Sequence, residues 1–361
     1  MIQARPAVEA LHRYVAPLEG RRGLLRLDFN ENTLGPSPKV LAAIRALPPE
    51  AYATYPEYAG LVEAYAAHAG VGPEHVAVFN GADAAIRSIF DAFGAPGGTL
   101  LTTAPTFGYY APCAQIAGMT VDAVPYASDL SFPWAAFTER LRQKPRVCII
   151  CNPNNPTSTL VAPARIIELA HQHPDTLFVV DEIYVSFTGQ SVVPEATRLE
   201  NVIALRSLSK SMGLAGLRLG FVCGSPGLVE RAFRVTGPYD INSFAVIAGK
   251  AALSDVEYMD AYIAEVAAAK ALTHSELDRL GLRYFSQGGN YLLVWPGRDV
   301  AEVEGGLRAR GILVRSMAGK PVIDGSFRLS VGTREQMQQF FAALAEVLRP
   351  GAAARSASAS R

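Results

Sequence analysis

Short apolar segments alternate with amphipathic segments through most of the chain, and this alternation restricts the possible folds more than any other feature. Helical patterns at 82–94 and 164–173 separate segments that resemble strands with two apolar faces. These six segments are 75–79, 99–104, 146–151, 177–181, 201–206 and 219–224. Strands with two apolar faces are typical of parallel sheets that helices cover on both sides. The sequence therefore predicts an α/β fold with a mostly parallel central sheet and helices on both faces.

The last third of the chain has a different pattern, which predicts a smaller α+β domain. A long helix is expected over 256–280, and shorter strands are expected at 290–296, 312–316 and 327–331. The low-complexity end, GAAARSASASR, is typical of disorder. The expected division is an N-terminal arm over 1–38 that joins the small domain, a large domain over 39–245, a small domain over 246–350 and a disordered tail over 351–361.

Composition argues against several classes of function. The 361 residues include 33 basic and 33 acidic side chains, so neither nucleic acid nor a membrane surface is an expected partner. The N-terminus lacks the apolar core of a signal peptide, and no run of about eighteen apolar residues predicts a membrane span. A cytoplasmic location is therefore expected. No metal site is expected either, because Cys148 and Cys151 would point to opposite faces of one strand. We interpret all four cysteines as buried, reduced thiols.

Polar residues follow four of the predicted strands at the point where each strand ends. They are residues 80–83, 152–157, 181–182 and 207–210. The carboxyl ends of parallel strands meet at one edge of a sheet, where ligands bind. One shared site at this edge is therefore predicted.

Part of this site suits an anion. The helix expected after residue 80 would offer free N–H groups and the positive end of its dipole. Ser207, Ser209 and Arg218 would add hydroxyl donors and a cation, so a phosphate dianion fits. Simple N-capping by Asp83 remains open.

Two further residues suit the other groups of one cofactor. Asp181 ends an apolar strand and could face a protonated ring nitrogen, or it could pair with an arginine. Lys210 could form a Schiff base with an aldehyde, which would remove its charge, or it could reach solvent. Phosphate, pyridine nitrogen and aldehyde are together the functional groups of pyridoxal 5'-phosphate (PLP).

A set of short motifs in a fixed order resembles the fold-type I PLP-dependent aminotransferases, and most closely their histidinol-phosphate aminotransferase branch. The likeness extends from about Tyr14 to Leu348. The motifs are LDFNEN with GPSP, TYPEY, NGADAAI, PTFGYY, CNPNNPTS, DEIY, SLSKSMGLAGLRLG and FRLSVGT. The resemblance implies the fold of a fold-type I PLP-dependent transferase, with PLP held in the large domain.

The resemblance also implies roles for the matching residues. Lys210 would form the Schiff base with PLP and carry the proton between the substrate Cα and the cofactor C4′, while Asp181 would keep the ring nitrogen protonated. Asn155 and Tyr184 would hydrogen-bond the phenolic oxygen of the ring, and Phe107 would stack on the ring. The phosphate would be bound by the N–H groups of Ala82 and Asp83, by Ser207, Ser209 and Arg218, and by Tyr55 of a neighbouring subunit. An obligatory homodimer is therefore expected.

The substrates implied by the resemblance are a small amino donor and a 2-oxo acid acceptor. Arg328 would bind a substrate carboxylate through a bidentate fork. Tyr14 and Arg315 would hold a substrate phosphate, and Asn30 would line the entrance. The implied reaction converts L-histidinol phosphate and 2-oxoglutarate into imidazole acetol phosphate and L-glutamate, in histidine biosynthesis. Tyr14 could instead pack the arm, and Arg315 could be a surface residue of its strand.

Several positions depart from the family pattern and keep other activities open. Thr33, Ala84, Ser158 and Phe244 replace residues that are usual in the branch, and they could retune the pocket. An aromatic or other amino-acid aminotransferase is one alternative, and a PLP-dependent decarboxylase of a phosphorylated amino acid is another. A PLP-sensing domain of a transcription regulator is a third, but the segment before residue 39 is too short for a winged helix.

Overall fold

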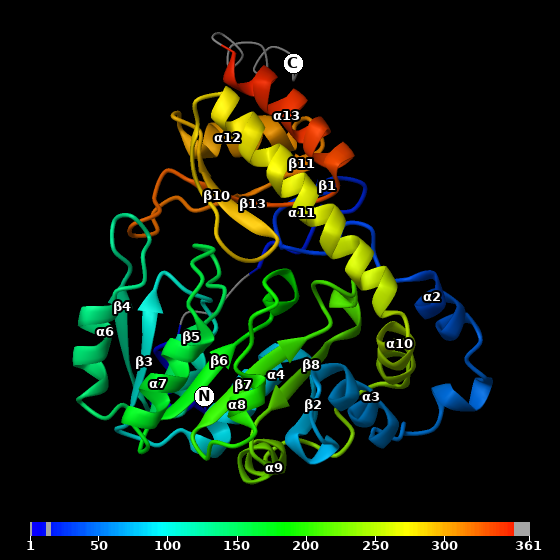
Figure 1. The fold of residues 1–361 in the computed structure, drawn as a ribbon, viewed down its shortest axis with the longest axis vertical. Coiled ribbons are helices and arrows are strands. Elements are labelled where there is room, and N and C mark those ends of the chain that lie inside the picture. The colour runs from blue at the N-terminus through cyan, green and yellow to red at the C-terminus, as the bar shows by residue number, and fades with distance from the viewer. Residues whose placement is uncertain (1, 12–15, 350–361) are drawn as a thin grey trace.

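A seven-stranded sheet forms the base of the molecule in the computed structural model, which describes residues 2–11 and 16–349 (Figure 1). Its strand order is β2-β8-β7-β6-β5-β3-β4. Strand β8 is antiparallel to both of its neighbours, and the other pairs are parallel. The expected mostly parallel sheet is confirmed. The strands are β2 (Val76–Asn80), β3 (Thr99–Ala104), β4 (Thr120–Pro125), β5 (Val147–Cys151), β6 (Leu177–Asp181), β7 (Val202–Ser207) and β8 (Leu219–Cys223).

Two buried clusters cover the two faces of this sheet. Cys148 belongs to one cluster and Cys151 to the other, as expected for strand positions of opposite orientation. All four cysteines are free and buried. The cluster that contains Cys148 includes residues of α2 (Pro38–Arg45), α3 (Ala59–Ala69), α6 (Trp134–Leu141), α7 (Pro163–Gln172), α8 (Val193–Ala196) and α10 (Ser243–Leu253). The other includes residues of α4 (Gly81–Phe93), α5 (Tyr110–Ile116) and α9 (Pro226–Arg234).

A smaller antiparallel sheet, of order β12-β13-β10-β9, forms the other end of the molecule. The long helix α11 (Val256–Arg279) runs from the large-sheet part into this smaller part (Figure 1). A third buried cluster joins the small sheet to helices α11, α12 and α13. The remaining elements here are β9 (Arg283–Phe285), β10 (Tyr291–Trp295), α12 (Val300–Arg308), β12 (Arg315–Ser316), β13 (Phe327–Ser330) and α13 (Arg334–Leu348).

The segment 312–316 is two strands, so the prediction of a single strand was wrong. Strand β11 (Ile312–Leu313) pairs in parallel with β1 (Leu25–Arg26), whereas β12 pairs with β13. The chain thus leaves one sheet and joins another within a few residues. A single apolar run cannot reveal this change of partner, because partners are chosen by tertiary packing.

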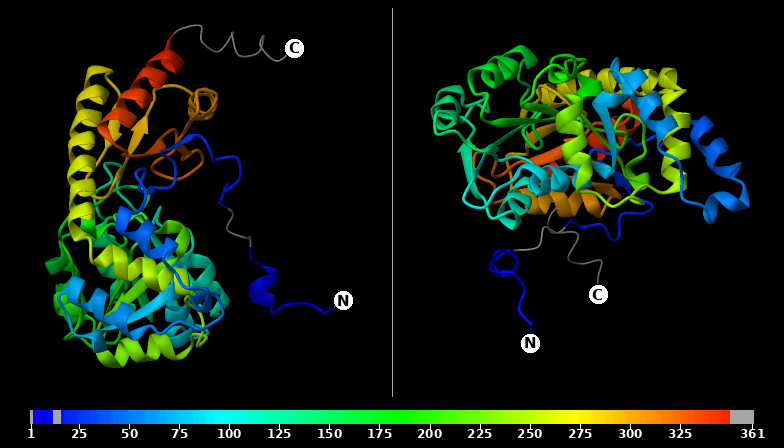
Figure 2. Two further views of the ribbon diagram at one scale, coloured as in Figure 1. Left: turned by 90° about the vertical axis from the view of Figure 1, so that its right-hand side faces the viewer. Right: turned by 90° about the horizontal axis from the view of Figure 1, so that it is seen from below.

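The N-terminal segment packs against the smaller part of the molecule after the short helix α1 (Pro6–Glu9) and residues 12–15 (Figure 2). Leu27 is fully buried in the third cluster, and its carbonyl oxygen accepts a hydrogen bond from the Ser330 N–H. The exact domain boundaries remain predictions.

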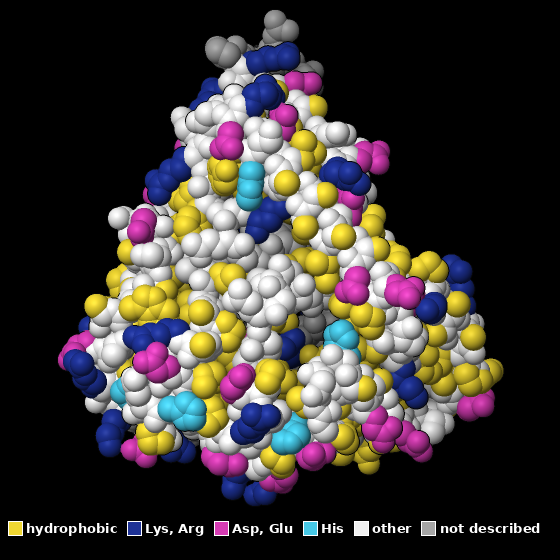
Figure 3. All heavy atoms as spheres, viewed as in Figure 1, with side chains coloured by type: hydrophobic (Ala, Val, Ile, Leu, Met, Phe, Trp, Pro, Cys, Tyr) yellow, Lys and Arg dark blue, Asp and Glu magenta, His cyan; other side chains and the backbone are white. Residues whose placement is uncertain are grey.

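Charged groups of both signs are interspersed over the face drawn in Figure 3. Within residues 2–11 and 16–349, no helix has the length and apolar character needed to cross a membrane. In the same part of the chain, no group of three or more His, Cys, Asp or Glu side chains is arranged to hold a metal ion.

Candidate active site

The carboxyl ends of four strands lie at one edge of the large sheet. Strands β5, β6 and β7 are parallel. Strand β2 has the same direction, because β8 is antiparallel to both β2 and β7. Asn80, Cys151, Asp181 and Ser207 are the last residues of these strands. The polar residues that follow them therefore belong to one region of the molecule.

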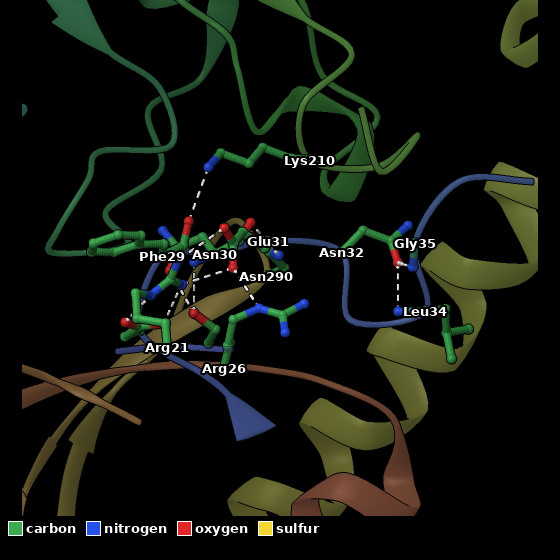
Figure 4. A network of polar contacts seen from close by, with 12 residues as sticks. Arg21, Arg26, Phe29, Asn30, Glu31, Asn32, Leu34, Gly35, Lys210 and Asn290 are labelled. Atoms are coloured by element: carbon green, nitrogen blue, oxygen red, sulfur yellow. Dashed lines mark hydrogen bonds and ion pairs between the residues drawn. The ribbon is translucent and has the colours of Figure 1, made fainter. Parts of the chain in front are cut away.

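Lys210 lies three residues beyond β7 and points at the N-terminal segment (Figure 4). Its Nζ donates a hydrogen bond to the carbonyl oxygen of Phe29 at 3.0 Å and lies 5.8 Å from the centre of the Tyr184 ring. Burial, and secondly the charge of Arg328, lowers the pKa of the Lys210 ammonium to about 8. A useful fraction of this amine is therefore neutral near neutral pH, as nucleophilic attack on an aldehyde requires.

Asp181 is buried at the end of β6. The Tyr110 hydroxyl donates a hydrogen bond to its Oδ2, and the Ile183 N–H donates to its Oδ1 at 3.1 Å. Burial raises the pKa of Asp181 to about 6 despite these two donors. A cation placed beside this carboxylate would stabilise its ionised form.

Tyr184 follows Asp181 by three residues and is also buried. Its Oη accepts a hydrogen bond from Asn30 Nδ2 at 3.0 Å. Burial raises the pKa of the Tyr184 phenol, so its hydroxyl remains protonated at neutral pH. Asn30 itself is fully buried.

The start of α4 and the loop after β7 form the predicted anion site. Arg218 Nη2 lies 2.8 Å from Asp83 Oδ2, and Ser207 Oγ lies 2.8 Å from Ser209 Oγ. Gly81 has φ +79°, and a Cβ added there would lie 2.5 Å from Arg218 Nη2. The backbone at the helix start therefore lies directly against the guanidinium. A second glycine, Gly220, lets β8 approach equally closely: its added Cβ would lie 2.4 Å from the Ala82 nitrogen.

The smaller part of the molecule contributes Arg328 from β13. Its guanidinium donates to Asn155 Oδ1 and to the Asp28 carbonyl oxygen. Phe107 is in edge contact with Tyr110, the partner of Asp181, at 5.5 Å between ring centres. The structure thus brings Arg328, Asn155 and the Lys210 region together from three distant parts of the chain.

The remaining predicted residues lie farther out or outside the described residues. Arg315 lies 5.9 Å from the ring centre of Phe29. Tyr55 is 70% exposed and stacks on Tyr239, with ring centres 4.0 Å apart. Tyr14 lies outside the described residues.

Two features were missed from the sequence. The first is Tyr110, which binds Asp181; PTFGYY contains it, but no local signal distinguishes it from the adjacent Tyr109. The second is a buried ion-pair network at the N-terminal segment (Figure 4). Arg21 donates to both carboxylate oxygens of Asp28, at 2.8 and 2.7 Å, and to Glu31 at 2.8 Å. This network fixes the segment that binds Lys210.

Comparison with known proteins gives consistent results. The family model described as aminotransferase class I and II matches residues 22–344. A histidinol-phosphate aminotransferase from Symbiobacterium thermophilum is 34% identical over 97% of this chain and its own full length. The crystal structure of histidinol-phosphate aminotransferase from Sinorhizobium meliloti in complex with pyridoxal-5'-phosphate has a TM-score of 0.88 and 25% identity, covering 97% of this chain and 98% of that chain.

A third similar protein has a different activity in its name. The crystal structure of L-threonine-O-3-phosphate decarboxylase from Porphyromonas gingivalis has a TM-score of 0.79 and 25% identity, covering 90% of this chain and 99% of that chain. The family match nevertheless extends over most of the sequence, and it agrees with the motifs and the fold. The chain belongs to the aminotransferase class I and II family.

Proposed function

We propose that this aminotransferase uses PLP to transfer the amino group of L-histidinol phosphate to 2-oxoglutarate, giving imidazole acetol phosphate and L-glutamate. The observation that carries the proposal is the placement of two groups at one edge of the sheet: Asp181 ends β6, and Lys210 follows the end of the neighbouring parallel strand β7. The pKa of the Lys210 ammonium is lowered and the pKa of the Asp181 carboxyl is raised. Two groups with perturbed pKa values at the ligand-binding edge of a sheet are candidates for a catalytic pair.

The donors in the site fit PLP. The phosphate would lie at the start of α4, where the Arg218 guanidinium lies directly against the Gly81 backbone and 2.8 Å from Asp83 Oδ2. Asp181 would face the ring nitrogen, Phe107 the ring face, and Asn155 with Tyr184 the phenolic oxygen. The additional phosphate donors would be the N–H groups of Ala82 and Asp83 and the hydroxyls of Ser207 and Ser209. When bound, PLP supplies an electron sink for the charge left on the substrate Cα.

The protein's own residues would then bind substrate and move a proton. Lys210 would take the proton from the substrate Cα, because its lowered pKa leaves a neutral amine available as a base. Arg328 would bind the carboxylate of the oxo acid. Arg315, with Tyr14, would favour a phosphorylated amino donor.

Two observations support histidinol phosphate as the donor. Near full-length relatives at 33–34% identity are named histidinol-phosphate aminotransferase. In addition, Arg315 and Arg328 are paired strand neighbours, which places two cations near the same end of the site. A phosphate dianion suits that charge.

A homodimer is part of the proposal. Tyr52, Tyr55 and Tyr239 are each more than 60% exposed, and Tyr52 is in edge contact with Phe244. Exposed aromatic side chains gathered in this way are typical of a covered surface. Tyr55 would reach the phosphate of the neighbouring subunit's PLP. The cytoplasmic location remains a prediction, supported by the free thiols.

Reductive trapping tests the proposal. Purified protein is loaded with PLP, reduced with borohydride and mapped by peptide mass spectrometry. We expect the pyridoxyl label on Lys210, and no label in Lys210→Ala. Lys270→Ala is the matched control, because burial also lowers the pKa of Lys270 to about 8 while its Nζ donates to the Gln287 and Gly289 carbonyl oxygens. Label on Lys270, or none at all on the wild-type protein, would refute the proposal.

A further inference from the structure

Asn30 is fully buried, and hydrogen bonds hold both its backbone and its side chain. It is 0% exposed and has φ +55°, a left-handed conformation that asparagine tolerates better than most residues. Its N–H donates to Ser330 Oγ at 2.8 Å, and its carbonyl oxygen accepts from Asn290 Nδ2 at 3.2 Å. Both backbone groups are therefore fixed by the smaller part of the molecule.

The same serine fixes which way the Asn30 side chain faces. Ser330 Oγ accepts the Asn30 N–H, and its own proton goes to Asn30 Oδ1 at 2.9 Å. In this pairing the amide oxygen of Asn30 lies on the Ser330 side and accepts the hydroxyl proton. The amide NH2 then lies on the opposite side, where it donates to Tyr184 Oη at 3.0 Å.

The hydrogen bond from Asn30 Nδ2 to Tyr184 Oη leaves the Tyr184 hydroxyl proton free for another acceptor. The buried phenol remains protonated, and its oxygen already accepts a hydrogen bond from Asn30. Within residues 2–11 and 16–349, no other hydrogen bond of the Tyr184 hydroxyl is found. Its proton is therefore available to an acceptor in the site.

We propose that Asn30 is a positioning residue, which makes Tyr184 a hydrogen-bond donor toward the phenolic oxygen of the bound cofactor. The inference rests on the proposed use of PLP. An oxygen that accepts one hydrogen bond donates its own proton more strongly. Donation by Tyr184 to the ring oxygen would lower the basicity of that oxygen and of the nitrogen through which Lys210 would hold the cofactor. Asn30 would thus keep the pKa of the lysine-bound cofactor low.

The Asn30→Asp variant tests the direction of this hydrogen bond. An ionised carboxylate can only accept, so it would take the Tyr184 proton away from the cofactor. We expect the pKa of the lysine-bound PLP, followed by its visible absorbance between pH 5 and pH 10, to rise by about one unit or more. The dissociation constant of PLP should rise by about tenfold.

A double-mutant cycle separates positioning from a merely structural role. If Asn30 acts through Tyr184, Asn30→Asp should add no further pKa shift in a Tyr184→Phe background. A structural role would lower the thermal stability of the PLP-free protein without moving this pKa. If Asn30→Asp does not fold, Ser330→Ala removes the group that orients the amide and should raise the same pKa by a smaller amount.

The outcomes are distinct. The inference would be overturned if the cofactor pKa in Asn30→Asp equalled that of wild type. If Asn30→Asp does not fold, an unchanged pKa in Ser330→Ala would overturn it instead. A pKa shift that persists undiminished in the Tyr184→Phe background would also overturn it. Failure of the wild-type protein to show any PLP absorbance would instead overturn the proposed function, and the inference with it.

Discussion

Asp181→Asn should stabilise the PLP-free protein while weakening its use of PLP. Asp181 is 1% exposed, and burial raises its pKa from 3.8 to about 6. The ionised carboxylate therefore lowers the free energy of unfolding unless a cation lies beside it. Asparagine has nearly the same size, can accept from the Ile183 N–H and can donate to the Tyr110 oxygen, so the packing is retained.

The size of the effect follows from the pKa shift. The difference between about 6 and 3.8 is about 2 units, and each unit corresponds to about 1.4 kcal/mol. Between these pH values the folded state binds more protons than the unfolded state, so stability falls as pH rises through this window. Asp181→Asn has no carboxyl group to ionise at this position, so its stability does not fall in this window. It should exceed wild type by about 3 kcal/mol above pH 6, and this advantage should vanish near pH 4.

Urea unfolding of the two PLP-free proteins at pH 7.5 and pH 4, at one protein concentration, measures the free-energy difference. Asp175→Asn is the control, because the Asp175 side chain is 73% exposed and pairs with Lys144 at the surface. It should change stability by less than about 1 kcal/mol at either pH. Adding PLP should stabilise wild type more than Asp181→Asn. Equal stability of wild type and Asp181→Asn at pH 7.5, or the same difference at both pH values, would refute the reasoning.

Three further changes probe other parts of the site. Gly81→Ala should raise the dissociation constant of PLP by about tenfold or more in a fluorescence titration, because its Cβ would lie 2.5 Å from Arg218 Nη2 at φ +79°. Ser158 has φ +70°, and its hydroxyl donates to the Gly288 carbonyl oxygen at 2.6 Å. In urea unfolding, Ser158→Ala should lower the free energy of unfolding by about 1–3 kcal/mol because this hydrogen bond is lost. Ser158→Gly should lower it less, because glycine adopts a positive φ without strain. Tyr55→Phe should weaken PLP binding in the same titration without changing the oligomeric state measured by light scattering; unchanged binding would contradict the proposed contact across subunits.

Much of the fold was predictable because buried parallel strands leave a strong signal. All six strands predicted for the large sheet are present within a residue of their expected limits. Strand β4 (Thr120–Pro125) was missed because it is an edge strand whose residues are exposed or half-buried, with a single buried residue. Its apolar pattern is therefore weak.

The positions of Asp181 and Lys210 in the fold were predictable, because Asp181 ends a strand and Lys210 follows one. The site was less predictable where contacts join distant segments. Asn30 was expected at the pocket entrance, yet it is buried against Ser330, which lies 300 positions away. The Arg21–Asp28 pair likewise depends on the course of the N-terminal segment. Local sequence carries no information on such pairings, because tertiary packing selects them.

The most direct test of the central claim is a single half-reaction. The PLP-loaded protein is mixed, without any oxo acid, with L-histidinol phosphate, L-phenylalanine or L-threonine phosphate, and the conversion of PLP to its pyridoxamine form is followed by absorbance. The account predicts fast conversion with L-histidinol phosphate and slow conversion with the other two. Faster conversion with L-phenylalanine, or release of carbon dioxide from L-threonine phosphate without conversion of the cofactor, would contradict it.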